Sequence, residues 1–262
     1  MYVRDPLESL SADGTITTGV DRRRVPAPFE PLIASLTSLF DESVALYLYG
    51  SVATGQAVVG ASDVDLIAYG VDPRAAAQLS TRLSEDNRAL TRGVAIGVLT
   101  AQDLDSGDAG YGNRVFLKHY CAWLGGPDPA ADLPTYPGDR AAARGFNGDL
   151  PLRVASWRQQ CGHIADGDER LALLSRAIGR KTLFAVAGLV SVRDGVWTTD
   201  RRVAAHRWAE IHPDLRSDLK QLLEWGDGQL SPDRHELQDL LDGAVTQIAL
   251  QFADQIGAWR AQ

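Results

Sequence analysis

The 262-residue sequence predicts an α+β fold in which a part built from strands and helices precedes a bundle of helices. In the first half, short apolar runs rich in strand-forming residues alternate with runs of helical periodicity. In the second half strand signals nearly vanish, and successive segments have apolar residues at helical spacing. Residues 127–138 contain four prolines, which is typical of a boundary between domains. We therefore expect an N-terminal domain at 26–130 and a C-terminal helical domain at 135–262.

The N-terminal domain is expected to contain three strands and two helices. The strands are short apolar runs bounded by turn residues, predicted at 46–49, 64–68 and 94–99. The helices have apolar residues at helical spacing and are predicted at 29–40 and 73–90. Three other segments are a loose polar leader at 1–25, a loop rich in Asp and Gly at 103–113, and an apolar run at 115–124 that fits either a helix or a strand.

Five helical segments in the second half predict an antiparallel bundle. They are predicted at about 139–164, 168–193, 200–210, 213–226 and 231–259. Ser231 is expected to cap the last of them, because Pro232 and Asp233 then fall in its first turn.

The chemistry is expected at the junction between the first two strands. Gly50 and Ser51 follow the first strand, where a glycine lets the backbone approach a ligand and a serine adds a hydroxyl, together a small nest for a phosphate. Asp63 and Asp65 begin the second strand, and residues two apart on a strand point to the same face. Two converging carboxylates repel each other unless a cation lies between them. This pattern predicts a site for a magnesium nucleotide.

The composition of the chain limits the classes of partner and the cellular location that we expect. The hydrophobic share of 45% and charged share of 23% are typical of a soluble globular protein, and the chain has no apolar stretch long enough to span a membrane. The net charge of −8 makes nucleic acid an unlikely partner, because a phosphate backbone is repelled by such a surface. Cys121 and Cys161 are far apart and form no CxxC motif, which favours a cytoplasmic location.

The Gly50-Ser51 pair followed by Asp63-x-Asp65 resembles the signature of the nucleotidyltransferase superfamily that includes DNA polymerase β. The resemblance implies a mixed sheet with flanking helices and transfer of a nucleotide from a triphosphate to a hydroxyl. In that family Gly50 and Ser51 would hold the triphosphate of ATP. Asp63 and Asp65 would hold Mg²⁺ as catalytic residues, and Ser62 would add a second contact to phosphate or metal.

The second half resembles the C-terminal domain of the aminoglycoside (streptomycin/spectinomycin) adenylyltransferases, which are antibiotic-resistance enzymes. The motifs that carry this resemblance are Leu124–Pro127, Gly167–Arg170, Asp200–Ala205 and Ile211–Pro213. The resemblance implies that Arg201, where that family has a lysine, reaches the ATP phosphates from the helical domain. It also implies that Asp168 binds a small, hydroxylated, cationic acceptor, and that the site lies between the two domains.

The third strand departs from the family pattern. Aligned without gaps, the position of the family's catalytic glutamate is Ala95, and no Asp or Glu lies between Val94 and Thr100. Two alternatives to an adenylyltransferase acting on an aminoglycoside therefore stay open. One is transfer to another small molecule or to a protein. The other is a pseudoenzyme or regulatory protein that binds the nucleotide without turnover. If a base is needed, Asp103, Asp105 and Asp108 are the nearest acids in the sequence.

Overall fold

The computed structural model describes residues 5–105, 107–229 and 232–259, and the chain divides into two compact units. The N-terminal unit is Met1–Pro137 and the helical unit is Gly138–Gln262. The fold is α+β, with a mixed four-stranded sheet and many helices. Each unit buries apolar side chains of its own and is described separately below.

The residues before the predicted first domain belong to the N-terminal unit. Strands β1 (Ser9–Leu10) and β2 (Ile16–Thr17) form an antiparallel hairpin, followed by the 3₁₀ helices η1 (Arg22–Arg24) and η2 (Ala27–Phe29). The side chain of Ile16 is buried, and its main-chain N–H donates to the Tyr136 carbonyl at 3.0 Å. The prediction of a loose leader is therefore wrong for residues 5–25, because the buried side chains of Ile16 and Val25 and the backbone hydrogen bonds around Ile16 fix this part of the chain.

The sheet has the order β5-β4-β3-β6. The predicted strands are confirmed as β3 (Ala45–Tyr49), β4 (Asp63–Tyr69) and β5 (Gly93–Leu99), and β6 (Cys121–Gly125) is the fourth. Strand β3 pairs antiparallel with both β4 and β6, whereas β4 and β5 are parallel. The sheet is therefore mixed.

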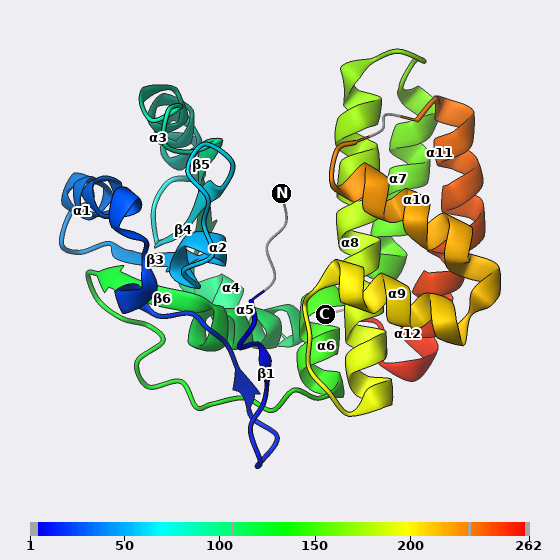
Figure 1. Ribbon diagram of the computed structural model, residues 1–262, viewed down its shortest axis with the longest axis horizontal. Helices are drawn as coiled ribbons and strands as arrows, with labels where there is room; N and C mark the ends of the chain where they lie inside the picture. Colours follow the sequence, from blue (N-terminus) through cyan, green and yellow to red (C-terminus); the bar gives the residue numbers. More distant parts are fainter. Residues whose placement is uncertain (1–4, 106, 230–231, 260–262) are drawn as a thin grey trace. The chain divides into compact units, whose positions relative to one another are not determined.

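Helices cover both faces of this sheet (Figure 1). Helices α1 (Glu30–Leu39) and α3 (Pro73–Asp86) pack on the face that carries Leu48, Val64 and Leu66, as their predicted periodicity requires. Helices α4 (Ala101–Asp105) and α5 (Gly107–Tyr120) pack on the opposite face, around Tyr47 and Ile67. The side chains of Asp63 and Asp65 belong to this second face, because residues alternate along a strand.

The loop predicted at 103–113 is wrong for the described residues, since 103–105 lie in α4 and 107–113 lie in α5. Thr100 begins α4 with a reciprocal cap: its main-chain N–H donates to Asp103 Oδ2 at 2.8 Å, and Asp103 N–H donates to Thr100 Oγ1 at 3.4 Å. The Asn113 amide then bonds the Asp103 carbonyl near the end of α4. Asp and Asn, which favour turns in isolation, act here as helix caps. The undecided segment 115–124 contains both the end of α5 and most of β6.

The helical unit is built around α8 (Glu169–Asp194), which buries most of its apolar residues against the surrounding helices (Figure 1). These helices are α6 (Arg140–Asn147), α7 (Leu150–His163), α9 (Arg201–Ile211), α10 (Arg216–Gly226) and α12 (Thr246–Gln255). The 3₁₀ helix η3 (Pro213–Leu215) leads into α10. The prediction that this half is helical is confirmed.

Two predicted helices are interrupted. The first breaks between α6 and α7, where Pro151 stands at the second position of α7 and has no N–H to continue a helix from α6. The last is divided into α11 (Arg234–Leu240), the π turn η4 (Leu241–Val245) and α12, with a kink at Gly243. Ser231, its predicted cap, lies outside the described residues. Asp233 caps α11 and forms a capping box with Glu236.

Candidate functional site

The turn after β3 has a backbone conformation that favours glycine. Gly50 has φ +73°, in the left-handed region, and begins the short helix α2 (Gly50–Ala53) that contains Ser51. A Cβ added to Gly50 would lie only 2.7 Å from Asp65 Oδ2. The carboxylate of Asp65 therefore occupies space that any other residue at position 50 would fill. The structure thus brings the predicted phosphate turn and one predicted metal ligand into contact.

Asp63 and Asp65 lie at the sheet end where β4 and β5 begin and β3 finishes. Asp65 pairs with Tyr49, the last residue of β3, and both carboxylates belong to the same face of β4. Burial raises the pKa of the Tyr49 hydroxyl above its usual value, and the negative charges of Asp65 and Asp63 add to this rise. The two carboxylates share one face of β4, as strand alternation predicts.

Arg92 is a member of this site that the sequence analysis does not identify. Its Nε donates to Asp63 Oδ1 at 3.0 Å, and its Nη2 donates to Asp63 Oδ2, so that the two side chains form a bidentate ion pair. The pair raises the pKa of the Arg92 guanidinium, and the charge of Asp65 contributes to the rise. The sequence shows only that Arg92 immediately precedes a predicted strand, whereas the parallel pairing of β4 and β5 is what places Gly93 beside Asp63.

Ser62 has a structural role in the described geometry. Its side chain is buried, and its hydroxyl oxygen accepts a hydrogen bond from the Val58 N–H at 2.9 Å. Its carbonyl accepts from the Arg92 N–H at 3.0 Å. Ser62 therefore shapes the loop before β4 and fixes the start of β5 beside it. Its contact with phosphate or metal stays a prediction.

Ala95 lies directly beside Asp65. The parallel register pairs Asp63 with Gly93 and Asp65 with Ala95, and paired residues on neighbouring strands share a face. The methyl group of Ala95 is exposed on that face. The position that the family resemblance assigns to a glutamate is thus adjacent to the two carboxylates, and it carries no acid here.

The two remaining predicted site residues begin helices of the other unit. Asp168 is the N-cap of α8: it accepts from the Arg170 N–H at 2.9 Å and forms an ion pair with the Arg170 guanidinium. Arg201 is the first residue of α9, and its Nη1 lies 3.5 Å from the position that a Cβ on Gly226 would take. Their roles toward acceptor and ATP stay predictions.

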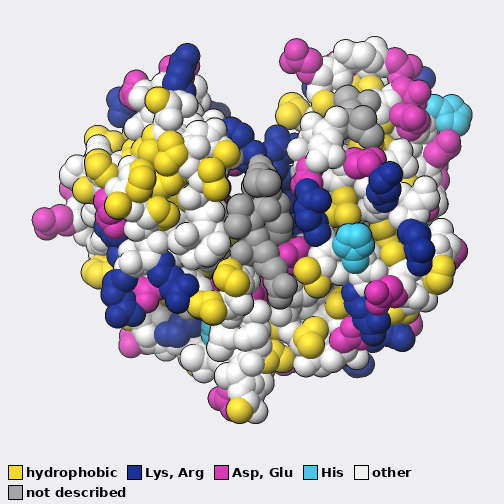
Figure 2. Space-filling model, in the orientation of Figure 1, with side chains coloured by type: hydrophobic (Ala, Val, Ile, Leu, Met, Phe, Trp, Pro, Cys, Tyr) yellow, Lys and Arg dark blue, Asp and Glu magenta, His cyan; other side chains and the backbone are white. Residues whose placement is uncertain are grey.

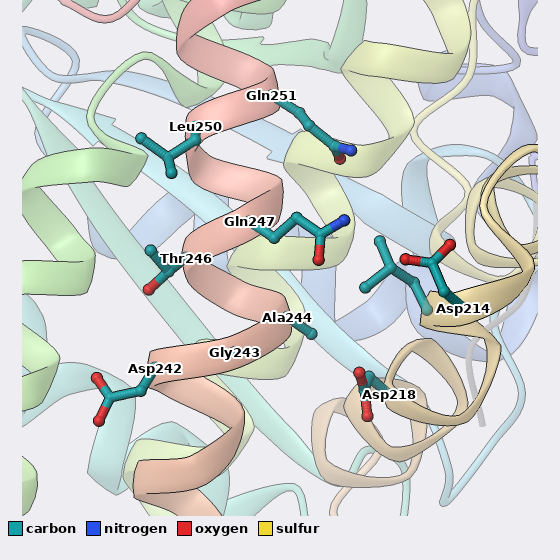
Figure 3. A pocket seen from close by; sticks show the side chains of 10 residues that line it. Asp214, Asp218, Asp242, Gly243, Ala244, Thr246, Gln247, Leu250 and Gln251 are labelled. Carbon is teal, nitrogen blue, oxygen red and sulfur yellow. The ribbon is translucent and has the colours of Figure 1, made fainter.

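A concave surface lies in the helical unit, between the start of α10 and the segment formed by η4 and α12 (Figure 3). Asp214, Asp218, Asp242, Gln247 and Gln251 supply its polar lining. Burial raises the pKa of the Asp218 carboxyl, and the charge of Asp214 adds to the rise. The described residues that line this groove include none of the predicted site residues.

The donor set at the sheet end fits a magnesium ion that is shared with a nucleotide. Mg²⁺ is commonly bound through one or two carboxylates, with substrate phosphates and water as the other ligands. Asp63 and Asp65 supply two carboxylates beside the Gly50 turn. Among the described residues, no cluster of three or more His, Cys, Asp or Glu side chains forms a metal site, so the phosphates would have to complete the coordination.

No protein-family model matches the chain, and a search of curated proteins finds no significant match. In the part of the chain that the structure describes, no helix is long and apolar enough to cross a bilayer. On the face of the helical unit seen in Figure 2, Lys and Arg side chains are interspersed with Asp and Glu. The functional proposal therefore rests on the local geometry and on the resemblance of the motifs.

Proposed function

We propose that this protein is a magnesium-dependent nucleotidyltransferase that transfers AMP from ATP to a hydroxyl of a small, cationic acceptor. The observation that carries the proposal is the contact between the Gly50 turn and the Asp65 carboxylate, with Asp63 on the same face of β4. The mixed sheet, in which the turn and the two acids lie on neighbouring strands, supports the same arrangement. Aminoglycosides are the acceptor class that the resemblance of the helical unit implies.

The residues have distinct parts in this reaction. Gly50 lets the main chain approach the triphosphate, and the Ser51 hydroxyl donates to a phosphate oxygen. Asp63 and Asp65 hold Mg²⁺, which when bound offsets the negative charge of the phosphates. The acceptor oxygen bonds to the α-phosphorus as the bond from that phosphorus to the bridging oxygen breaks, and pyrophosphate leaves. The proton of the hydroxyl passes to water or to a basic group of the acceptor, because Ala95 offers no base.

Mass spectrometry tests this function directly. Purified protein is incubated with ATP, Mg²⁺ and a panel of hydroxylated acceptors, including aminoglycosides and other small molecules. We expect the mass of AMP, less water, to be added to at least one acceptor. The double variant Asp63→Asn/Asp65→Asn should add none. A product that forms equally with this variant would contradict the proposed site.

The position of Ala95 beside Asp65 favours a second candidate function, namely binding of a magnesium nucleotide without catalysis. General-base assistance is typically worth about 10²–10⁴-fold in rate. A protein that lacks the base can therefore keep the nucleotide and lose most of the reaction. Magnesium-dependent ATP binding with no product across the acceptor panel would support this regulatory role over the enzyme.

Replacing Ala95 by Glu distinguishes the two functions. The new carboxylate lies beside Asp65, and we expect it to raise turnover by at least about tenfold, the low part of the range for base catalysis, with any acceptor that the parent modifies. Ala95→Gln has a similar size without the charge and should not raise turnover. If the parent is already fast and Ala95→Glu slows it, Ala95 does not occupy the place of a catalytic base, and Asp103, Asp105 and Asp108 are the next residues to replace.

A further inference from the structure

The ion pair between Arg92 and Asp63 places a permanent positive charge where the proposed function needs cations. Arg92 stands directly before β5, and its main-chain N–H is held by the Ser62 carbonyl at 3.0 Å. Its side chain reaches across to both oxygens of Asp63. The Arg92 side chain is 47% exposed and that of Asp63 is 30% exposed, so the pair faces solvent rather than the core. A ligand can therefore reach it.

The net charge of this site with one metal ion equals that of a site with a third acid and a second metal ion. A site with a third carboxylate at position 95 could hold a second divalent cation near the phosphates. Ala95 removes one negative charge from such a site. A guanidinium in place of a divalent cation removes one positive charge. The two changes cancel, so the site with Ala95, Arg92 and one metal ion has the same net charge toward a nucleotide as the site with three acids and two metal ions.

The geometry of the pair permits one metal ion beside the arginine. Arg92 uses Nε and Nη2 for Asp63, and Nη1 takes no part in this bidentate contact. Guanidinium groups bind phosphate oxygens readily, because their N–H donors are planar and always charged. Each carboxylate oxygen of Asp63 has a second lone pair, so Asp63 can hold Arg92 and a metal ion together. A second metal ion on Asp63 would place three cationic groups around one carboxylate, and their mutual repulsion disfavours it.

Building on the proposed function, we propose that Arg92 replaces the second metal ion of this site. The protein then binds its nucleotide with a single divalent cation, held by Asp63 and Asp65, while Arg92 contacts the phosphates. The role deepens the proposed function by assigning the metal stoichiometry and a further phosphate-binding residue.

The test counts metal ions. Mn²⁺ is titrated into the full-length protein with a non-hydrolysable ATP analogue, and bound Mn²⁺ is measured by electron paramagnetic resonance. Nucleotide affinity is measured by calorimetry on the same samples. The variants are Arg92→Gln, Arg92→Lys and the double variant Arg92→Gln/Ala95→Glu. Arg88→Gln is the matched control, because Arg88 is exposed, lies four residues away and bonds the Glu85 carbonyl.

We expect the parent and Arg88→Gln to bind one Mn²⁺ per nucleotide with equal affinity. Arg92→Gln should weaken nucleotide binding by about tenfold to a hundredfold, the range for a hydrogen bond to a charged group. Arg92→Lys should lose less, since it keeps the charge without the planar fork. The double variant should bind two Mn²⁺.

Three results would overturn this role of Arg92: two Mn²⁺ in the parent, unchanged affinity in Arg92→Gln, or one Mn²⁺ in the double variant. Circular dichroism of each variant establishes that the fold is kept. Failure of the proposed function gives a different result, because the parent itself would then bind no nucleotide in a metal-dependent way.

Discussion

Gly50 and Gly60 share the same backbone torsion, φ +73°, in different surroundings. A Cβ on Gly50 would meet Asp65 Oδ2 at 2.7 Å, whereas no atom lies within 4 Å of one on Gly60. An alanine at either position should cost about 1–2 kcal/mol of stability, because an L-residue is strained in the left-handed region. Only Gly50→Ala also displaces the Asp65 carboxylate.

We therefore predict that Gly50→Ala weakens magnesium-dependent ATP binding at least about tenfold, whereas Gly60→Ala leaves it within about twofold, since only the first variant displaces the proposed metal ligand Asp65. Thermal unfolding and calorimetric titration of both variants measure the two effects separately. Equal loss of ATP affinity in the two variants would mean that the Gly50 turn is not in contact with the nucleotide.

At the site, the sequence predicts what is local and misses what depends on strand pairing. The Gly50 turn and the alternation of Asp63 and Asp65 follow from neighbouring residues, and the structure brings the turn and Asp65 together. Arg92 is 29 positions from Asp63, and their contact requires β5 to lie parallel and adjacent to β4. A sequence with several possible strand orders does not reveal that pairing. The register also accounts for Ala95, which adjoins Asp65 because the same two strands pair.

Among the elements, the start of α8 offers a test of Asp168. Its carboxylate caps the helix, and hydrogen bonds from the Arg170 side chain and main chain lower its pKa. We predict that Asp168→Ala lowers Tm by a few degrees. The Tm of Asp168→Asn should stay close to that of the parent, because Asn is also a good N-cap. If Asp168 also binds a cationic acceptor, Asp168→Asn should lose acceptor affinity while keeping Tm. Equal Tm for the parent and Asp168→Ala would contradict the capping role.

The sign of the pH dependence follows from the lowered pKa. A carboxyl with a folded pKa below its ordinary value stabilises the protein at pH above that ordinary value. This contribution is lost as the pH falls through the folded pKa. The difference in Tm between the parent and Asp168→Ala should therefore shrink in acid, which differential scanning calorimetry between pH 7 and pH 3 can measure.

Elements with strong periodicity were predictable, and those fixed by caps or by distant contacts were not. The long apolar faces of α1, α3 and α8 are visible in the sequence, as are the apolar runs of β3, β4 and β5. Helices α4 and α5 contain Asp and Gly, and the start of α4 depends on the reciprocal bonds of Thr100 and Asp103. The β1–β2 hairpin has two residues per strand, and its order depends on Ile16 and on the distant Tyr136.

At the scale of the whole molecule, Arg201 tests whether the helical unit takes part in nucleotide binding. If Arg201 contacts the ATP phosphates, Arg201→Ala should weaken ATP binding by about 1.5–3 kcal/mol, the range for a hydrogen bond to a charged group. Arg202→Ala is the control, because the neighbouring Arg202 is exposed and forms an ion pair with Asp227 of the same unit. If calorimetric titration gives the same ATP affinity for the parent and for Arg201→Ala, Arg201 does not contact the ATP phosphates.

Both proposed functions, the enzyme and the regulatory protein, require magnesium-dependent ATP binding by Asp63 and Asp65. Its most direct measurement is calorimetric titration of magnesium ATP into the parent and into Asp63→Asn/Asp65→Asn. Asp72→Asn is the control, since it removes one acid at the cap of α3, where Asn serves equally well. We predict that the parent and the control bind ATP only when Mg²⁺ is present, and that the double variant, still folded, does not. Unchanged affinity in the folded double variant would contradict the assignment of the site.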